Sequence, residues 1–397
     1  MFHESIGAFC ANAVEREIVC GPMNPKLKVW ILSDGVPGHV NQAYGLVKWM
    51  SDRYGMSCLE ISARIRARNL SRPWMPFLLR RGRRGARIAI FAHRWKMSMP
   101  PLAVEPNQGL MAEHENHSFL DKLSDNDVDL IISAGGNTSF ANAALAAWMN
   151  CDNIFIGSRR RLDSELFKAH LTMEPVGKDN NIVMELAPTL IDPVKLRQDA
   201  PVVKEKLGIK EGNPVYALII GGDGAGFRYQ RDDWLRFVRM MKRYRDQDLA
   251  QWLVTTSRRT TRKNDTLIKE YLDSLPEGSV FERVIWSDAP RKVMQAYLSA
   301  ADRIFVTADS MSMITECIST EKPVTLLYPR LSAPNERYRK AIDGFVRLGF
   351  CAREEERHRI GNNANMRDIR STLLDRLEER IEALRFRKHL SSISIPE

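Results

Sequence analysis

The feature that most constrains this chain is a repeated alternation of short apolar runs with longer segments of helical periodicity. Each run ends in a glycine-rich or polar loop, as in VWILSDGVPGHVNQAYGL at Val29–Leu46. Such alternation is typical of a parallel sheet with crossover helices, so we expect an α/β protein. The runs expected to be strands are KVWILS, VDLIISA, CDNIFI, PVYALII, QWLVTT, ADRIFVT and KPVTLLY.

The 397 residues are enough for two such domains. Prolines and a charged helix start interrupt the pattern near APTLIDPVKLRQDAPVV, which favours a linker between two Rossmann-like domains there. Leucines and isoleucines at helical spacing in MRDIRSTLLDRLEERIEALRFRKHL predict a long amphipathic helix. We therefore expect an N-terminal extension (1–25), an N-terminal α/β domain (26–190), a C-terminal α/β domain (202–350) and a helical tail (351–397).

Several classes of protein are disfavoured. Six cysteines without a CxxC pair argue against a disulfide framework and a zinc site. The first 25 residues carry three glutamates and lack the apolar core of a signal peptide. No uninterrupted apolar stretch reaches about 18 residues, the length of a membrane-spanning helix. We expect a cytoplasmic protein.

Open α/β sheets bind ligands at the carboxyl ends of their strands, so the loops there are the places to search. In IIGGDGAG, Gly221 and Gly222 can bring backbone amides close to phosphate oxygens, although a tight structural turn explains the same glycines. In VTTSRRT, the hydroxyls of Thr256 and Ser257 with Arg258 suit a pyrophosphate, although a solvated helix start is the alternative.

The segment VTADSMSMITE is the most specific of the three loops. Asp309, Ser310 and Ser312 follow a strand and begin a helix, whose N-terminus favours negative charge. Glu316 lies one to two turns into that helix, where its carboxylate can accept hydrogen bonds from two ribose hydroxyls. Ordinary helix capping by Ser310 or Ser312 explains the serines almost as well.

Taken together, LSDGVPGHVNQ, IIGGD, LVTTSRRT and VTADSMSMITECISTEKPV resemble the family named after a plant mitochondrial-fission (elongated-mitochondria) protein. The resemblance covers roughly residues 26–350. Members are regarded as glycosyltransferase-like, with the two-domain GT-B fold. The spacing from Glu316 to Pro323 is also similar to the donor-binding helix of MurG-type N-acetylglucosaminyltransferases, in which such a glutamate holds the nucleotide ribose. The chain departs from the family where Gly224 replaces a common serine after Asp223, and where SDAPRK replaces Glu-Asn-Pro.

The resemblance implies a nucleotide-sugar donor bound by the C-terminal domain. Arg228, Arg258 and the helix at Ser310 would neutralise the leaving diphosphate in place of a cation, so neither a metal nor a cofactor is expected. The donor-binding residues expected are Gly221, Gly222, Asp223, Arg228, Thr256, Ser257, Arg258, Asp309, Ser310, Ser312 and Glu316.

In a GT-B enzyme the first loop of the N-terminal domain faces the donor across a cleft, where a base takes the proton of the acceptor hydroxyl. His39 or Asp34 can serve, and the loop loosely resembles the Gly-Gly-His loop of MurG-type enzymes. The alternatives are a hydrogen-bonded structural role for His39, a helix-capping role for Asn41 and Gln42, and a plain turn in SAGGN. The acceptor contacts expected are Gly38, Asn41, Gln42, Gly135 and Asn137.

A basic-apolar insertion is expected over 61–104, where eleven Lys or Arg occur without one Asp or Glu. Within 72–96, an apolar wedge beside the arginines suits an anionic membrane surface. A nucleic-acid patch and a solvated loop are the alternatives, but no nucleic-acid fold is recognisable, so no nucleic-acid partner is expected. The net charge of +10 agrees with a negatively charged partner. The wedge comprises Trp74, Phe77, Leu78 and Leu79.

The expected function is therefore a metal-independent glycosyltransferase, peripheral on the cytoplasmic face of a membrane. It would move a sugar from a nucleotide donor to a membrane glycolipid or a cell-envelope saccharide such as lipopolysaccharide. A non-enzymatic, membrane-associated nucleotide-binding or fission-type protein is the main rival. A MurG-like nucleotide-sugar epimerase is the second.

Overall fold

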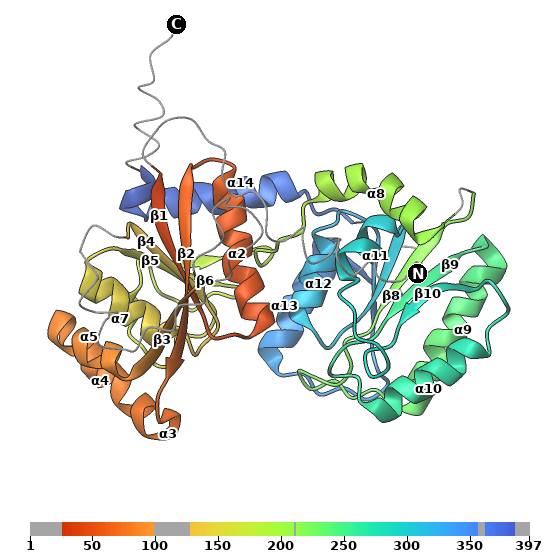
Figure 1. Cartoon of the computed structure of the whole chain (residues 1–397), viewed down its shortest axis with the longest axis horizontal. Helices are drawn as coiled ribbons and strands as arrows, with labels where there is room; N and C mark the ends of the chain where they lie inside the picture. The colour runs from red at the N-terminus through yellow and green to blue at the C-terminus, as the bar shows by residue number, and fades with distance from the viewer. Residues whose placement is uncertain (1–25, 99–127, 210–211, 356–361, 386–397) are drawn as a thin grey trace, which may run out of the picture. The chain divides into compact units, whose positions relative to one another are not determined.

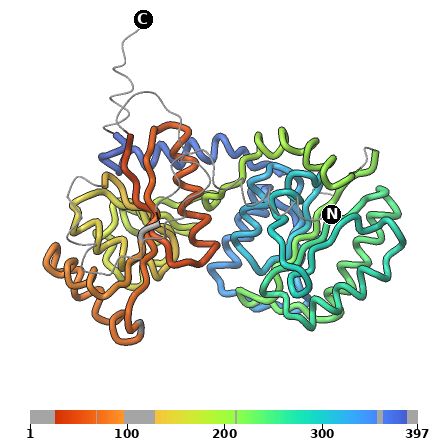
Figure 2. The backbone as a smooth tube through the Cα atoms, in the orientation of Figure 1, coloured from red at the N-terminus to blue at the C-terminus, as the bar shows by residue number. Residues whose placement is uncertain are grey.

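The computed structural model describes residues 26–98, 128–209, 212–355 and 362–385. These residues form two units. The N-terminal unit contains the described residues up to Leu190 and from Arg367 onward, and the C-terminal unit contains Ile191–Met366. The chain thus leaves the first unit once and returns to it with its last helix (Figure 2). The predictions on 1–25, 99–104 and the end of the tail lie outside the described residues.

The N-terminal unit is built on a seven-stranded sheet in the order β3-β2-β1-β4-β5-β6-β7 (Figure 1). All neighbouring strands are parallel except β2 and β3. The central strands β1, β4 and β5 are apolar and almost entirely buried, as their sequences predict. The strands are β1 (Leu27–Ser33), β2 (Met56–Ile65), β3 (His93–Ser98), β4 (Leu130–Ala134), β5 (Asp152–Ile156), β6 (Ala169–Thr172) and β7 (Asn181–Val183).

The C-terminal unit has a six-stranded, all-parallel sheet in the order β10-β9-β8-β11-β12-β13. Counted within the unit, this order is 3-2-1-4-5-6, the arrangement of a Rossmann fold. The two sheets, parallel except for the β2–β3 pair, confirm the predicted pair of Rossmann-like α/β domains. The strands are β8 (Val215–Ile219), β9 (Gln251–Thr255), β10 (Val280–Val284), β11 (Arg303–Thr307), β12 (Val324–Leu327) and β13 (Ala352–Arg353).

Helices cover both faces of each sheet. In the N-terminal unit, α5 and α7 enclose an apolar core together with Trp30, Ile61 and Phe155. In the C-terminal unit, α9 pairs with α10 and α8 with α11 (Figure 1). The helices are α2 (Pro37–Ser51), α3 (Arg68–Ser71), α4 (Met75–Leu79), α5 (Gly82–Phe91), α7 (Ser139–Met149), α8 (Pro193–Leu207), α9 (Arg231–Asp248), α10 (Arg262–Asp273), α11 (Met294–Ala300), α12 (Met311–Ile318), α13 (Glu336–Arg347) and α14 (Met366–Glu378), with 3-10 turns η1 (Arg72–Trp74) and η2 (Ser164–Leu166).

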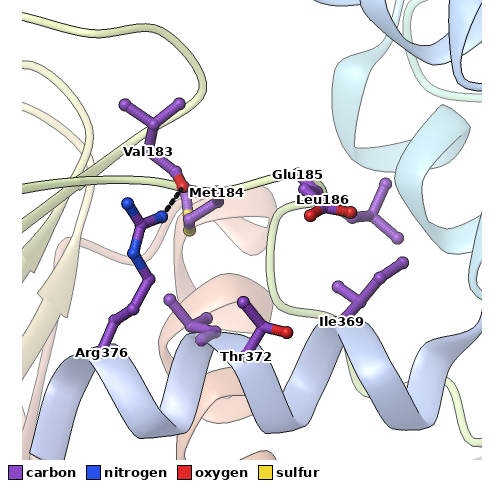
Figure 3. A pocket seen from close by; sticks show the side chains of 8 residues that line it. Val183, Met184, Glu185, Leu186, Ile369, Thr372 and Arg376 are labelled. Carbon is purple, nitrogen blue, oxygen red and sulfur yellow. Dashed lines mark hydrogen bonds between the residues drawn. The ribbon is translucent and has the colours of Figure 1, made fainter.

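Helix α14 packs beside the end of α2, on the N-terminal unit. Arg53 donates hydrogen bonds to Asp375 at 2.6 Å and Glu378 at 2.9 Å, and Leu377 is fully buried. A small pocket with about 20 Å³ of free space, enough for one water molecule, separates α14 from residues 183–186 (Figure 3). The helix ends at Glu378, so the expected long helix is shorter than its periodic sequence.

The basic stretch differs from the insertion expected at 61–104. Its described part supplies the end of β2, the helices α3–α5 and β3, and several of its apolar side chains, among them Met75, Ala86 and Ile90, enter the core. Leu79, expected in the exposed wedge, is buried, while Trp74 and Phe77 are 65% and 50% exposed. The stretch is therefore half core and half surface.

The expected linker is also helical. Asp192 caps α8 by accepting hydrogen bonds from the amides of Val194 and Lys195 at 3.0 and 3.3 Å, and Pro193 occupies the first turn, where no amide donor is needed. Pro201 lies inside α8. The C-terminal unit consequently begins at Ile191, eleven residues before the domain start expected at 202.

Candidate functional site

In the C-terminal unit, the loop after β8 lies against the loop after β9. A side-chain carbon at Gly222, which has φ +104°, would lie 2.5 to 2.7 Å from backbone atoms of Arg259 and Thr260. Gly222 and Arg259 also form a parallel bridge that extends the pairing of the two strands. Glycine is required here because the two backbones approach so closely.

Hydrogen bonds tie these loops to the end of β11. The amide of Gly221 donates to the hydroxyl of Thr307 at 2.7 Å, and the hydroxyl of Ser257 donates to the carbonyl of Gly221. The hydroxyl of Thr256 accepts from the amide of Trp286 at 2.9 Å. The structure thus brings together the loops after β8, β9 and β11. The Ser257 hydroxyl joins the β9 loop to the β8 loop, whereas the Thr256 hydroxyl binds the segment after β10.

Asp309 lies at the centre of this arrangement. Its side chain is fully buried, a carbon on Gly221 would meet it at 2.3 Å, and Arg259 Nη2 lies 2.5 Å from its Oδ2. Burial raises the pKa of Asp309 to about 6, against the lowering effects of Thr307 and Arg259. Its Oδ1 has no hydrogen-bond partner among the described residues.

The arginines of these loops differ in whether they form an ion pair. Arg258 and Arg228 are exposed and make no ion pair within the described residues, whereas the adjacent Arg259 is engaged by Asp309. Sequence analysis singled out Arg258 and missed Arg259. Two consecutive arginines in SRR give no signal for which one turns toward the buried carboxylate. Asp223 accepts a hydrogen bond from the Tyr229 amide at 2.9 Å, so it closes its own turn.

Helix α12 begins at this same edge. Ser310 is the N-cap residue but makes no capping side-chain hydrogen bond, and its hydroxyl lies 3.3 Å from that of Ser312. Glu316 is half-buried in the second turn of the helix. The capping alternative therefore does not account for Ser310, and the free amides of the first turn remain at the edge formed by the three loops.

In the N-terminal unit, Asp34 and His39 form a pair at the end of β1. His39 Nδ1 lies 3.0 Å from Asp34 Oδ2, and the Val36 amide donates to Asp34 Oδ1 at 3.0 Å. Burial raises the pKa of Asp34, but the bonds from His39 and Val36 outweigh it and lower the pKa below its usual value. With Nδ1 held by a carboxylate, Nε2 is the nitrogen that can exchange a proton.

His39 lies in the first turn of α2 and not in the loop expected from the sequence. Pro37 starts the helix at its first position, where proline is favoured, so Gly38, Asn41 and Gln42 are helical as well. His39 therefore has a fixed backbone beside its carboxylate partner.

The loop after β4 closes around this pair. A side-chain carbon on Gly135, which has φ +87°, would lie 2.1 to 2.4 Å from ring atoms of His39. Asn137 contributes a hydrogen bond that lowers the pKa of Asp34, while its own Oδ1 is buried without a partner among the described residues. The acceptor contacts expected after β4 and the residues expected as base thus lie together.

No metal centre is evident in the part of the chain that the structure describes, where no three His, Cys, Asp or Glu side chains gather as ligands. No described helix is both long and apolar enough to cross a membrane.

The family model for mitochondrial fission ELM1 proteins matches residues 37–374. The chain belongs to this family. The match confirms the resemblance found in the sequence and spans most of both units of this ELM1-family protein. Among curated proteins, none matches the chain.

Solved structures with similar folds have low sequence identity. The UDP-GlcNAc 2-epimerase of Neisseria meningitidis is 15% identical at a TM-score of 0.47, covering 89% of this chain and 100% of its own. The UDP-GlcNAc 2-epimerase of Methanocaldococcus jannaschii is 12% identical at a TM-score of 0.46, and the match covers 93% of this chain and 100% of the epimerase chain. The calicheamicin glycosyltransferase CalG4 is 11% identical at a TM-score of 0.42, and the match covers 94% of this chain and 100% of the CalG4 chain.

Proposed function

We propose that this ELM1-family protein is a metal-independent glycosyltransferase that moves a sugar from a nucleotide-sugar donor to a membrane glycolipid or a cell-envelope saccharide. The observation that carries the proposal is the convergence of three loops and the start of α12 at one edge of the C-terminal sheet. The carboxyl edge of a Rossmann-type sheet is where such folds bind nucleotides.

In this proposal the C-terminal unit binds the donor. The exposed guanidinium groups of Arg258 and Arg228 and the free amides at Ser310 contact the diphosphate, because charge-assisted hydrogen bonds to phosphate need fixed donors. Glu316 accepts hydrogen bonds from the ribose. These fixed positive groups stabilise the leaving diphosphate without a metal ion.

The N-terminal unit supplies the base. Asp34 holds His39 through Nδ1, which leaves Nε2 to take the proton of the acceptor hydroxyl as that hydroxyl attacks the anomeric carbon. The carboxylate also stabilises the imidazolium that forms. The lowered pKa of Asp34 keeps it charged during this step.

We further propose that the surface formed by α3–α5 docks on the cytoplasmic side of a membrane. Its exposed apolar residues stand among the arginines of the same segment: Arg81 lies 4.3 Å from the Phe77 ring centre, and Arg80 pairs with Asp163 at 2.7 Å. An apolar surface surrounded by cations suits an anionic bilayer. The exposed apolar residues are Leu70, Trp74, Phe77, Ile88 and Phe91.

The test separates phosphate from ribose recognition. Nucleoside diphosphates of each base are screened for thermal stabilisation, and the best one is compared with its nucleoside. We expect E316A to weaken both ligands about tenfold or more, and R258A to weaken only the diphosphate. E277A, at an exposed glutamate of the same unit, serves as control.

Four results oppose the proposal. Stabilisation by no nucleotide removes the donor site. Binding without turnover of any nucleotide sugar favours the non-enzymatic rival, and sugar isomerisation without an acceptor favours the epimerase. Transfer that stops with EDTA contradicts the metal-independent mechanism.

A further inference from the structure

Two arginines that sequence analysis did not select stand on either side of the Asp34–His39 pair. Arg64 lies at the end of β2 and Arg160 follows β5, at the same carboxyl edge as His39. Both are exposed, and neither makes an ion pair with any described residue. Their positions are not required by the packing of the sheet, so their role needs another explanation.

Arg64 reaches toward the loop that carries Asp34. Its Nη2 lies 3.3 Å from the position of a side-chain carbon on Gly35. In the β2–β3 pairing, Arg64 is directly opposite Arg94. Like charges at such a position destabilise a sheet, yet no described acid neutralises either one. An unneutralised pair of guanidinium groups at a ligand-binding edge attracts an anion.

Arg160 reaches the site from the other side. Its Nε lies 2.2 Å from the position of a side-chain carbon on Gly136, so its stem lies across the loop that touches His39. Arg160 and Arg161 have φ of +52° and +69°. Left-handed conformations in two consecutive non-glycine residues are strained and tend to occur at functional sites.

The strand order places the two arginines on either side of the Asp34–His39 pair. Across the sheet the strands run β2-β1-β4-β5, so Arg64 and Arg160 flank the strands that carry His39 and Gly135. Three strand spacings separate β2 from β5, about 14 Å. Arg64 lies against Gly35, next to Asp34, and Arg160 lies against Gly136, next to the Gly135 that contacts His39.

We propose that Arg64 and Arg160 bind an oxyanion, a phosphate or a carboxylate, carried by the saccharide acceptor, and thereby position its hydroxyl at His39. This inference rests on the proposed glycosyltransferase function and names the acceptor class as anionic. Guanidinium groups suit both oxyanions because their paired N–H groups match two oxygens. The acceptor would thus be selected by its charge as well as by its sugar ring.

The experiment follows the imidazole signals of His39 by NMR, assigned through their loss in H39Q. Glucose 6-phosphate, glucuronate, glucose and inorganic phosphate are titrated separately. We expect the first two to shift the His39 signals, glucose to have little effect, and R64Q or R160Q to weaken binding about tenfold or more. K178Q removes an exposed charge that precedes β7, at the opposite edge of the sheet, and should bind like wild type.

Glucose binding as tightly as glucose 6-phosphate, or unchanged binding in R64Q and R160Q, would overturn the inference. Inorganic phosphate binding as tightly as the sugar phosphate would overturn the assignment to an acceptor. Nucleotide binding to the C-terminal unit is measured separately through E316A. Failure of the anion site with intact nucleotide binding therefore rejects this inference alone, whereas loss of nucleotide binding rejects the proposed function.

Discussion

At the scale of single residues, the two candidate sites depend on glycines that allow close approach. Gly135 is the clearest case, because any side-chain carbon would overlap the His39 ring. Sequence analysis selected Gly135 as an acceptor contact. The structure gives it a second role, as the residue that leaves room for the imidazole beside Asp34.

G135A should therefore displace His39 from Asp34. Gly177, with φ +65° and nothing within 4 Å of an added carbon, offers a matched control that carries similar backbone strain without the clash. Both substitutions should cost about 1 kcal/mol or more in stability, but only G135A should change the His39 imidazole signals in NMR. Unchanged His39 signals in G135A would show that the ring does not depend on this contact.

Asp309 gives the C-terminal unit a dependence on pH. Its pKa is raised to about 6 in the folded protein from an ordinary value of 3.8, so its contribution is fully present below pH 3.8 and is lost as pH rises through about 6. Wild type should lose about 2 kcal/mol relative to D309N between about pH 4.5 and 7.5. The unfolding transition of the C-terminal unit in each protein measures this difference. If the stability difference between wild type and D309N stays constant with pH, Asp309 is not the group that titrates in this range.

At the scale of elements, sequence predicted the strands whose residues are buried on both faces. β1, β4, β8 and β11 read as continuous apolar runs because helices cover both faces of each sheet. The strands β2, β3, β6, β7, β10 and β13 were missed. In β2, polar residues such as Glu60 and Arg64 alternate with core residues, and β3 begins HRWK, so neither resembles a buried parallel strand. Arg64 reaches the loop of Asp34 because β2 pairs with β1 and Arg64 lies near the end of β2. The spacing of residues along the chain does not reveal this strand order.

The helices α3–α5 allow a test of membrane binding at this scale. Replacing Trp74 and Phe77 together with alanine removes two half-exposed aromatic side chains without touching the core below them. Partition onto vesicles of phosphatidylcholine with phosphatidylglycerol should fall more than about tenfold, and wild-type binding should weaken as salt is added. L331A, at an exposed leucine of the C-terminal unit, is the control. Equal partition of the double variant and wild type would leave membrane docking to another surface.

At the scale of the whole molecule, the N-terminal unit is built from two stretches of chain that are separated in sequence by the C-terminal unit. The tail follows the C-terminal unit in sequence, yet from Arg367 onward its described residues belong to the N-terminal unit. An amphipathic pattern predicts a helix with one buried face, but it does not say which surface buries that face. The partner becomes apparent only from the contacts of Arg53 and Tyr54 with Glu378.

Deleting residues 367–397 should therefore destabilise the N-terminal unit, although the C-terminal unit directly precedes these residues in sequence. The deletion exposes the surface covered by six buried apolar side chains, and at about 1.5 kcal/mol or more each their loss is comparable to the whole stability of a domain. Hydrogen exchange should show loss of protection in α2 and the N-terminal sheet, while β8, β9 and β11 keep theirs. Removing only 386–397 should leave both units protected. Loss of protection mainly in the C-terminal sheet would contradict this assignment of α14. The six side chains are those of Ile369, Leu373, Leu374, Leu377, Ile381 and Leu384.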